Sequence, residues 1–253
     1  MIISFDIGIK NMAYCLMKNN DIIKWGVIDL CEKIPLCCHC GNESKFYDNQ
    51  NYCGRHYKKS GKVKMPNIYK NIKKISYKKI KKICIEEDID IEINKKKDEL
   101  IEDIEKYKDE YFLHEIKRKA SKDINMIDIG VRLKEYLDTN IKEYHIETVL
   151  IENQIGTIAI RMKTIQGMLS QYFIMNNLTN IHFVSSINKL KEFSLKKLTY
   201  TERKKKSIEI TKSMIENTNK DWNEYFLKHK KKDDLSDSYL QLIWFINNAS
   251  SIT

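Results

Sequence analysis

The sequence predicts an α/β protein whose mixed five-stranded sheet is flanked by helices and whose chain carries a large insertion. Three observations support this fold class. Three strand-like runs joined by short turns open the chain, two later strand-like runs alternate with helical patterns, and a cysteine-rich, charged stretch separates the two parts. Short turns indicate antiparallel neighbours and helical connections indicate parallel ones, so the sheet is expected to contain both.

The expected elements follow the hydrophobic pattern along the chain. Apolar runs bounded by polar turns predict strands, and apolar residues spaced three and four apart predict helices. Strands are expected at Met1–Asp6, Met12–Met17, Ile22–Leu30, His145–Ile151 and Ile181–Val184. Helices are expected at Ile124–Leu137, Ile155–Met175, Thr201–Asn217 and Asp233–Asn247.

The charge of the chain favours a polyanion as partner. The 253 residues include 45 Lys and Arg against 35 Asp and Glu, which gives a formal charge of +10. The excess is local, because residues 57–82 contain 11 lysines and no acid. The sequence lacks both a secretory leader and an apolar run of roughly 18 residues, so an intracellular protein is expected. The phosphate-binding loop of ATPases and the nucleophile elbow of serine hydrolases are also absent from the sequence.

A zinc module is expected at residues 37–56. Cys37 and Cys40 form one C-x2-C pair, and Cys53 and His56 form a second pair twelve residues later. Thiolate and imidazole ligands at this spacing suit a tetrahedral structural Zn²⁺ site. Unligated thiols are the simpler interpretation, and a shifted ligand set remains open, with candidates Cys31, Cys38 and His39.

Charged segments follow the zinc module. The lysine-rich stretch includes Tyr69 and Tyr77, a composition that suits phosphate contacts with occasional base stacking. The acidic stretch Glu86–Glu115 has the apolar spacing of a helix and can fold back on the lysines as a helical arm. A solvated charged surface is the alternative for both segments.

Four acids stand where expected elements begin or end. Asp6 closes the first strand in FDIGIKN, and Glu152 closes the fourth in LIENQ. Asp234 and Asp237 in KKDDLSDS lie three residues apart near a helix start and share one face. Acids at neighbouring strand ends and on a facing helix can converge, and Mg²⁺ or Mn²⁺ would offset their repulsion and support phosphodiester hydrolysis. Each acid taken alone is more often a turn or cap residue, and Asp233 can be the helix N-cap.

The segments FDIGIKNMAY, LIENQ and KKDDLSDS resemble the three motifs of RuvC-type Holliday junction resolvases in the ribonuclease H-like superfamily, most closely those of poxviruses and related large DNA viruses. The resemblance covers residues 1–30 and roughly 123–250. It divides the chain into a nuclease core, 1–30 with 121–253, and an insertion, 31–120. By motif position, the resemblance implies that four acids bind the metal ions: Asp6, Glu152, Asp234 and Asp237. Asp233 is the reserve candidate for this set. The resemblance also implies that Lys232 contacts the scissile phosphate or the attacking water.

The same resemblance implies a homodimer that binds a four-way DNA junction. Such enzymes make paired symmetric nicks with two metal ions per site and leave 5′-phosphate and 3′-hydroxyl ends. The apolar helix Ile155–Met175 suits the dimer contact, although burial within its own monomer is the alternative. A viral enzyme of this kind would act in a cytoplasmic replication compartment or in the host nucleus. Contacts with junction arms are expected from the basic clusters beside the last acids, which include Arg203, Lys204, Lys205, Lys206, Lys230 and Lys231.

Two other functions are compatible with parts of the sequence. The RuvC-like nuclease domain of transposon-associated, RNA-guided proteins also combines these acids with a zinc ribbon, but there the ribbon usually follows the glutamate. A zinc-containing nucleic-acid-binding protein on an inactive ribonuclease H-like scaffold is the non-enzymatic alternative.

Overall fold

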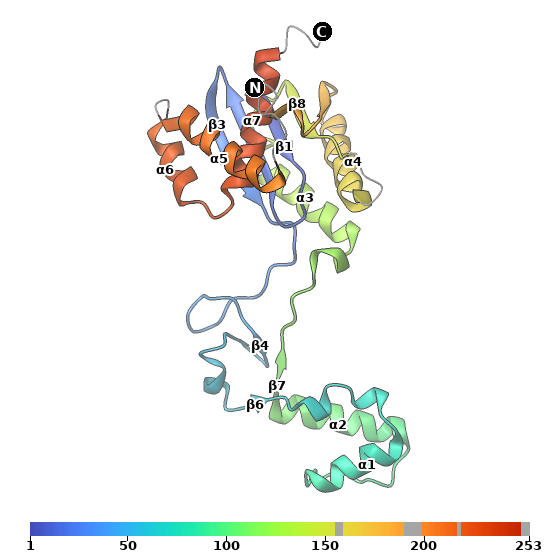
Figure 1. Ribbon diagram of the computed structural model, residues 1–253. Helices are drawn as coiled ribbons and strands as arrows, with labels where there is room; N and C mark the ends of the chain where they lie inside the picture. Colours follow the sequence, from blue (N-terminus) through green and yellow to red (C-terminus); the bar gives the residue numbers. More distant parts are fainter. Residues whose placement is uncertain (155–158, 190–198, 217–218, 249–253) are drawn as a thin grey trace. The chain divides into compact units, whose positions relative to one another are not determined.

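The computed structural model describes residues 1–154, 159–189, 199–216 and 219–248 (Figure 1). The chain forms two compact units: a core unit, Met1–Cys31 with Ala120–Thr253, and an insertion unit, Glu32–Lys119. Each unit has its own hydrophobic clusters. Within the described residues, no helix has the length and hydropathy needed to cross a membrane.

The core unit contains the expected five-stranded mixed sheet. The first three strands form an antiparallel meander, and β1, β8 and β9 are parallel neighbours. The sheet order is β3-β2-β1-β8-β9, which puts the strand that ends in Asp6 beside the strand that ends in Glu152. The strands are β1 (Ile2–Asp6), β2 (Met12–Lys18), β3 (Asp21–Ile28), β8 (Thr148–Glu152) and β9 (Ile181–Val184).

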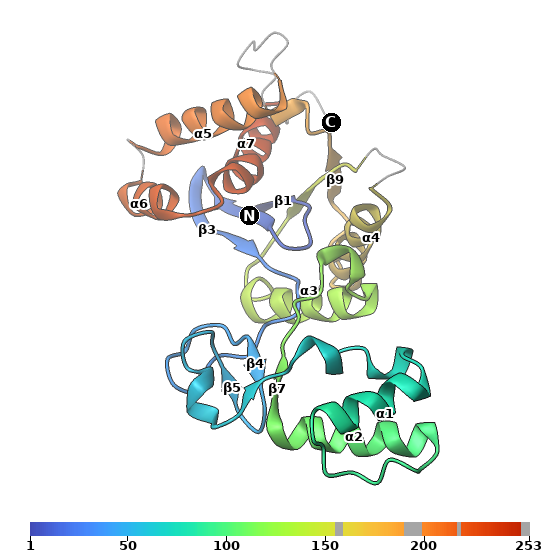
Figure 2. The same cartoon turned by 60° about the horizontal axis from the view of Figure 1, so that its bottom comes forward.

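Helices cover both faces of this sheet (Figure 2). Side chains alternate between the faces along each strand, so Leu16 packs in one cluster and Cys15 in the other. The first face packs against α3 (Met126–Asn140) and α4 (Ile160–Met175). The second packs against α5 (Tyr200–Glu216), α6 (Lys220–Lys228) and α7 (Lys232–Asn248).

Helix α6 lies between the last two expected helices and was not predicted from the sequence. Its pattern is short, with Trp222, Tyr225 and Phe226 on the side that packs against the sheet. The Asn219 side chain accepts a hydrogen bond from the Trp222 backbone N–H and caps the helix start. Other expected boundaries differ by a few residues at helix and strand ends. Residues 155–158 of the expected helix Ile155–Met175 lie outside the described residues, as does Asn217 at the end of Thr201–Asn217.

The insertion unit combines a small sheet with a helical pair. Its strands lie in the order β5-β4-β7-β6: β4 (Phe46–Tyr47), β5 (Asn51–Tyr52), β6 (Val63–Lys64) and β7 (Phe112–Glu115). The helices are α1 (Tyr77–Glu86) and α2 (Lys97–Tyr111). The single helix expected over Glu86–Glu115 is therefore wrong at both ends. The chain turns at Asp88, which has a positive φ of 49°, and Phe112 begins a strand because it pairs with Val63 in the small sheet.

Candidate active site

The four acids named from the sequence lie at one edge of the core sheet. Asp6 and Glu152 end neighbouring parallel strands, so their side chains emerge side by side. Asp234 lies in the first turn of α7, and Asp237 follows one turn later on the same face. The topology thus brings together residues that are separated by more than two hundred positions in the sequence.

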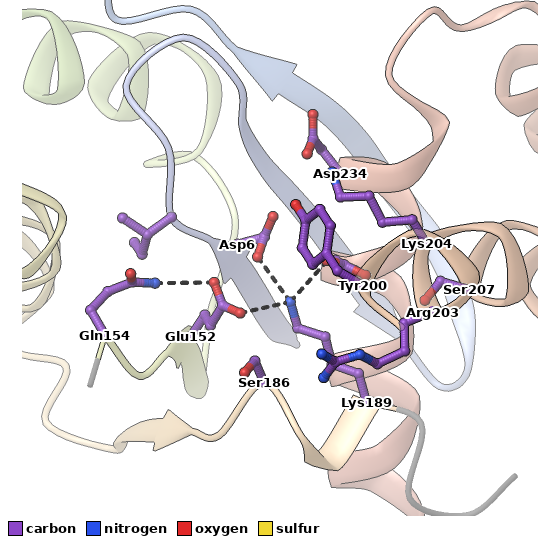
Figure 3. Close-up of a pocket in the computed structure, with 12 residues that line it drawn as sticks. Asp6, Glu152, Gln154, Ser186, Lys189, Tyr200, Arg203, Lys204, Ser207 and Asp234 are labelled. Carbon is purple, nitrogen blue, oxygen red and sulfur yellow. Dashed lines mark hydrogen bonds and ion pairs between the residues drawn. The ribbon is translucent and has the colours of Figure 1, made fainter. Parts of the chain in front are cut away.

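The centre of this cluster is Lys189, which the sequence analysis did not identify. Its Nζ lies 2.9 Å from Asp6 Oδ1 and 3.1 Å from Glu152 Oε1 (Figure 3). It also lies 3.4 Å from Asp237 Oδ2. The side chain of Lys189 is only 4% exposed, so a buried ammonium neutralises part of a buried acidic cluster.

The protonation of these groups reflects burial and mutual repulsion. Burial, with repulsion from Asp6, raises the pKa of Glu152 to about 7. Burial also raises the pKa of Asp237 to about 6, although the Lys189 ammonium opposes this shift. Burial alone would lower the pKa of Lys189, but the surrounding carboxylates outweigh it and hold that pKa above its ordinary value.

Asp234 is less well satisfied than the other three acids. Its Oδ2 is buried and accepts no hydrogen bond from any described residue. The Nζ of Lys231 lies 3.6 Å from that oxygen. Burial and the neighbouring Asp233 raise the pKa of Asp234. Asp233, the reserve candidate, instead forms an ion pair with Lys204 at 2.5 Å.

Neighbouring polar contacts hold the acids in place. Gln154 Nε2 donates to Glu152 Oε2 at 3.0 Å, and the backbone N–H of Gln154 donates to Gln166 Oε1 on α4 at 3.1 Å. The buried Gln241 on α7 donates to Ser4 Oγ at 3.0 Å and to the Phe5 carbonyl at 3.2 Å. These bonds tie α4 and α7 to the strand ends that carry the acids.

A pocket of about 440 Å³ opens above the cluster. Its lining is mostly polar. Its described lining consists of Asp6, Ile7, Glu152, Gln154, Ser186, Lys189, Tyr200, Arg203, Lys204, Ser207, Asp234 and Asp237.

The expected DNA-binding residues are distributed unevenly around this pocket. Arg203 and Lys204 line it, whereas Lys205 and Lys230 are exposed outside its lining. Lys206 pairs with Glu209 at 3.0 Å, and Lys231 faces Asp234. Lys232 Nζ donates to the His229 carbonyl at 2.9 Å and is not part of the lining.

Three residues that line the pocket, Lys189, Tyr200 and Ser207, were not among the residues expected from the sequence. Glu152 pairs with Val184 in the parallel register, so the segment after β9 emerges at the same edge as Glu152. A lysine in that segment, Lys189, is therefore placed to reach the acids. Tyr200 and Ser207 lie on α5, whose side facing the pocket carries no hydrophobic pattern to mark it.

A second cluster of metal-type ligands lies in the insertion unit. Cys37, Cys40, Cys53 and His56 place one ligand atom each within 4.8 Å of one another. Cys40 Sγ lies 3.7 Å from Cys53 Sγ, and Cys53 Sγ lies 3.6 Å from His56 Nδ1. Tetrahedral bonds of about 2.3 Å from zinc to sulfur separate two sulfurs by nearly this distance, so the four residues could hold Zn²⁺.

The alternative zinc ligands lie differently. Cys38 is exposed and outside the group of four, and the His39 ring packs against His56 and Tyr52. Cys31 belongs to the core unit, where its Sγ lies 3.8 Å from Ser121 Oγ. Burial raises the pKa of Cys37, but hydrogen bonds to the His39 and Cys53 backbone and to His56 outweigh burial and lower it to about 5. Cys37 is therefore a ready thiolate ligand.

Comparisons with known proteins place the chain in a family. No curated protein matches the sequence. Among solved structures, the crystal structure of the yeast mitochondrial Holliday junction resolvase Ydc2 aligns over 100% of this chain and 86% of its own, with 14% identity and a TM-score of 0.42. A family model described as poxvirus A22 protein matches residues 113–248, more than half of the chain, and this range contains every acid of the cluster except Asp6. The chain therefore belongs to the poxvirus A22 protein family of RuvC-type Holliday junction resolvases.

Proposed function

We propose that this protein is a metal-dependent endonuclease that resolves four-way DNA junctions by paired symmetric nicks, leaving 5′-phosphate and 3′-hydroxyl ends. One observation carries the proposal: Asp6, Glu152 and Asp237 converge on the single ammonium of Lys189, with Asp234 lining the same pocket. The open pocket can admit an extended phosphodiester strand. Because the chain belongs to a resolvase family, we expect its substrate to be branched DNA.

The donor set of the pocket fits hard divalent cations. Asp6, Glu152, Asp234 and Asp237 offer carboxylate oxygens, which are the ligands that Mg²⁺ and Mn²⁺ prefer. The buried Asp234 Oδ2 accepts no hydrogen bond from the described residues, and its ion-pair partner Lys231 Nζ lies 3.6 Å away, so a directly bound cation would compensate the burial of this oxygen more fully. Bound by these acids, two such ions would activate a water and stabilise the leaving oxygen.

The protein's own groups would orient the substrate. Lys204 and Arg203 line the pocket and supply positive charge for phosphate oxygens. Lys189 lies among the acids and can contact the scissile phosphate, a role that the family resemblance had suggested for Lys232. Lys232 is held by the His229 carbonyl, which favours Lys189 for this role.

A homodimer would supply the two sites that paired nicks need. Helix α4 supports a dimer contact, because Ile160, Ile174 and Met175 are 70%, 45% and 75% exposed. The opposite side of α4 packs in the core through Ile165, Leu169 and Phe173. The helix is thus only half covered within its own chain, which fits a second copy better than full burial in the monomer.

Zinc would have a structural role in the insertion unit. Cys37, Cys40, Cys53 and His56 supply four ligands, which fill the tetrahedral shell of Zn²⁺ and leave no open position for a substrate. The small β4–β5 hairpin beside them buries few apolar residues, so the metal would contribute much of its stability.

The nuclease proposal is tested with a synthetic four-way junction. Asp237→Asn should lower single-turnover nicking in Mg²⁺ by at least about a hundredfold, because it removes a charged ligand oxygen from the centre of the cluster. Asp233→Asn is the matched control on the same helix turn. Asp233 pairs with Lys204 and should matter far less. Full nicking by Asp237→Asn would refute the proposed site.

The role of Lys189 is tested in the same assay. Lys189→Gln should abolish most nicking while junction binding persists, whereas Lys232→Gln should leave the rate within about threefold of wild type. The reverse pattern would return the phosphate contact to Lys232. Product ends are read by ligation, since paired 5′-phosphate and 3′-hydroxyl ends reseal.

A further inference from the structure

The insertion unit has a strongly unequal distribution of charge over its surface. Residues 57–82 contain 11 lysines and no acid. Three of these lysines pair with a carboxylate: Lys62 with Asp48, Lys70 with Glu115 and Lys82 with Glu86. The other eight have no carboxylate oxygen within 4.0 Å among the described residues. Most of the positive charge of this segment is therefore free to meet a ligand.

The acidic helix of the same unit does not neutralise these lysines. The apolar residues of α1 and α2, such as Ile80 and Leu100, pack in one shared cluster. Each helix buries its apolar side there, so its charged side points away from that cluster. The side-chain ion pairs of α2 are made with Lys95, Lys106, Lys108 and His114, all of which lie outside residues 57–82.

The 3₁₀ turn Ile72–Lys74 and helix α1 pack into the same hydrophobic cluster and carry exposed lysines around it. Ile72 and Ile83 anchor the two elements in the same cluster, and both are nearly fully buried. Lys73, Lys74, Lys78 and Lys79 are exposed around this anchor. Exposed ammonium groups on elements that are anchored by buried residues suit contact with phosphate groups, because such contact does not require bases to be read.

Aromatic rings contact one lysine of the basic segment, in the part that follows the Cys/His cluster. Lys64 Nζ lies 4.4 Å from the Tyr57 ring centroid and 5.1 Å from that of Phe46. These cation–π contacts hold an ammonium group without consuming it in an ion pair. The exposed Lys58 and Lys59 follow Tyr57 directly on the 3₁₀ helix Tyr57–Ser60.

We infer that residues 57–82 form a second DNA-binding surface, separate from the catalytic pocket, that holds the sugar-phosphate backbone of a duplex arm. The choice of DNA as the polyanion rests on the proposed function. The surface would add affinity without adding sequence preference, since lysine contacts to phosphate carry no base information. The catalytic acids would then select the cleavage point and the insertion unit would retain the arm.

The test uses the full-length protein with four exposed lysines replaced: Lys73→Gln, Lys74→Gln, Lys78→Gln and Lys79→Gln. A charge-matched control replaces Lys18, Lys142, Lys212 and Lys220, four exposed lysines of the core unit that do not line the catalytic pocket. Affinity for a four-way junction is measured without Mg²⁺ between 50 and 200 mM salt, and a linear duplex is measured in parallel. Zinc content and circular dichroism check that both variants fold.

The insertion variant should bind at least about tenfold more weakly, and its slope of log K against log salt should fall by up to about 3 to 4, because each lost phosphate contact removes about 0.9. Its single-turnover nicking rate at saturating protein should match wild type. Equal affinity and slope in the insertion and control variants would overturn the inference and leave the lysines to a different polyanion, such as an acidic protein. Absence of nicking by wild type would instead refute the proposed function, and the salt slopes would still decide the binding surface.

Discussion

Lys189 places a buried positive charge among three carboxylates, and this charge opposes the effect of burial on the pKa values of Glu152 and Asp237. Its Nζ makes the shortest contact with Asp6, and the contact with Asp237 is the longest of the three. Burial favours the neutral form of these acids, and one ammonium cannot offset three carboxylates, so the remaining negative charge adds to the effect of burial. Glu152 and Asp237 are the residues whose pKa values rise accordingly.

This protonation makes the stability of the magnesium-free protein depend on pH. Glu152 has a pKa of about 7 in the folded protein against an ordinary value of 4.5, so between these values the folded chain binds the proton more tightly than the unfolded chain. The resulting stabilisation is fully present below about pH 4.5 and is lost as the pH rises through about 7. The free energy of unfolding should therefore fall by up to about 3 kcal/mol over that window.

Urea unfolding at several pH values measures this effect. All three tryptophans, Trp25, Trp222 and Trp244, belong to the core unit, so tryptophan fluorescence reports on that unit alone. Glu152→Gln is the control, since an amide does not titrate, and its stability should vary less between pH 5 and 8. Identical pH profiles for both proteins would contradict the shifted pKa.

The four acids were predictable from the sequence, but their lysine partner was not. Asp6, Glu152, Asp234 and Asp237 each stand at the boundary of an element that the hydrophobic pattern reveals. Lys189 follows β9 in a lysine-containing stretch of sequence that has no strand-like or helical periodicity to distinguish it. Burial of a lysine depends on partners far away in the sequence, so only the folded structure identifies it.

At the scale of elements, the turn between β1 and β2 requires glycine at position 8. A Cβ on Gly8 would lie 2.6 Å from the Asn11 carbonyl oxygen, closer than real contacts allow. This turn follows Asp6 directly, so a shift of its backbone would also move one acid of the cluster around Lys189. The motif glycine in FDIGIKN is thus explained by the packing of the turn on itself.

Gly8→Ala should destabilise the core unit by about 1–3 kcal/mol, because the turn backbone must move to admit the methyl group. Gly130→Ala on α3 is the matched control. Its Cβ would meet only the flexible Met168 side chain at 3.4 Å, and alanine is the better helix former, so it should be neutral or stabilise by up to about 1 kcal/mol. Chemical denaturation followed by tryptophan fluorescence compares the two. Equal effects of both substitutions would mean that the turn tolerates a side chain.

The strands of the sheet were easier to predict from the sequence than the elements of the insertion. Strand β9 has the bounds expected from the pattern, because four apolar or aromatic residues lie between polar turns. The strand β7 was missed, since its residues Phe112 and Leu113 continue the apolar spacing of α2. There the pairing with β4 and β6 overrides the local helical pattern.

At the scale of the whole molecule, the two units have separate hydrophobic clusters and should respond separately to damage. The zinc module of the insertion unit has few buried apolar residues of its own, among them Phe46, Tyr52 and Leu113. The folding of the zinc module should therefore depend on a bound Zn²⁺, whereas the folding of the core unit depends on the hydrophobic contacts between its sheet and helices.

The proposed zinc site predicts that Cys53→Ser abolishes zinc binding and exposes amides such as that of Cys38, which donates to the Asn51 carbonyl at 3.0 Å, to hydrogen exchange. The unfolding midpoint reported by tryptophan fluorescence should stay unchanged, because no tryptophan lies in the insertion unit. Cys38→Ser is the control and should retain zinc, since Cys38 lies outside the four-residue cluster. Metal analysis and exchange mass spectrometry read both results. Zinc loss in Cys38→Ser would require a different ligand set.

The chain leaves and re-enters the core unit at neighbouring points. Leu30 is anchored by its N–H to the Ile9 carbonyl and by its carbonyl to Arg132, and Cys31 Sγ lies 3.8 Å from Ser121 Oγ. A short peptide could close this gap without changing the register of any core strand. The insertion unit thus interrupts the core unit between two neighbouring points, and its removal would leave the strand ends that carry Asp6 and Glu152 in place.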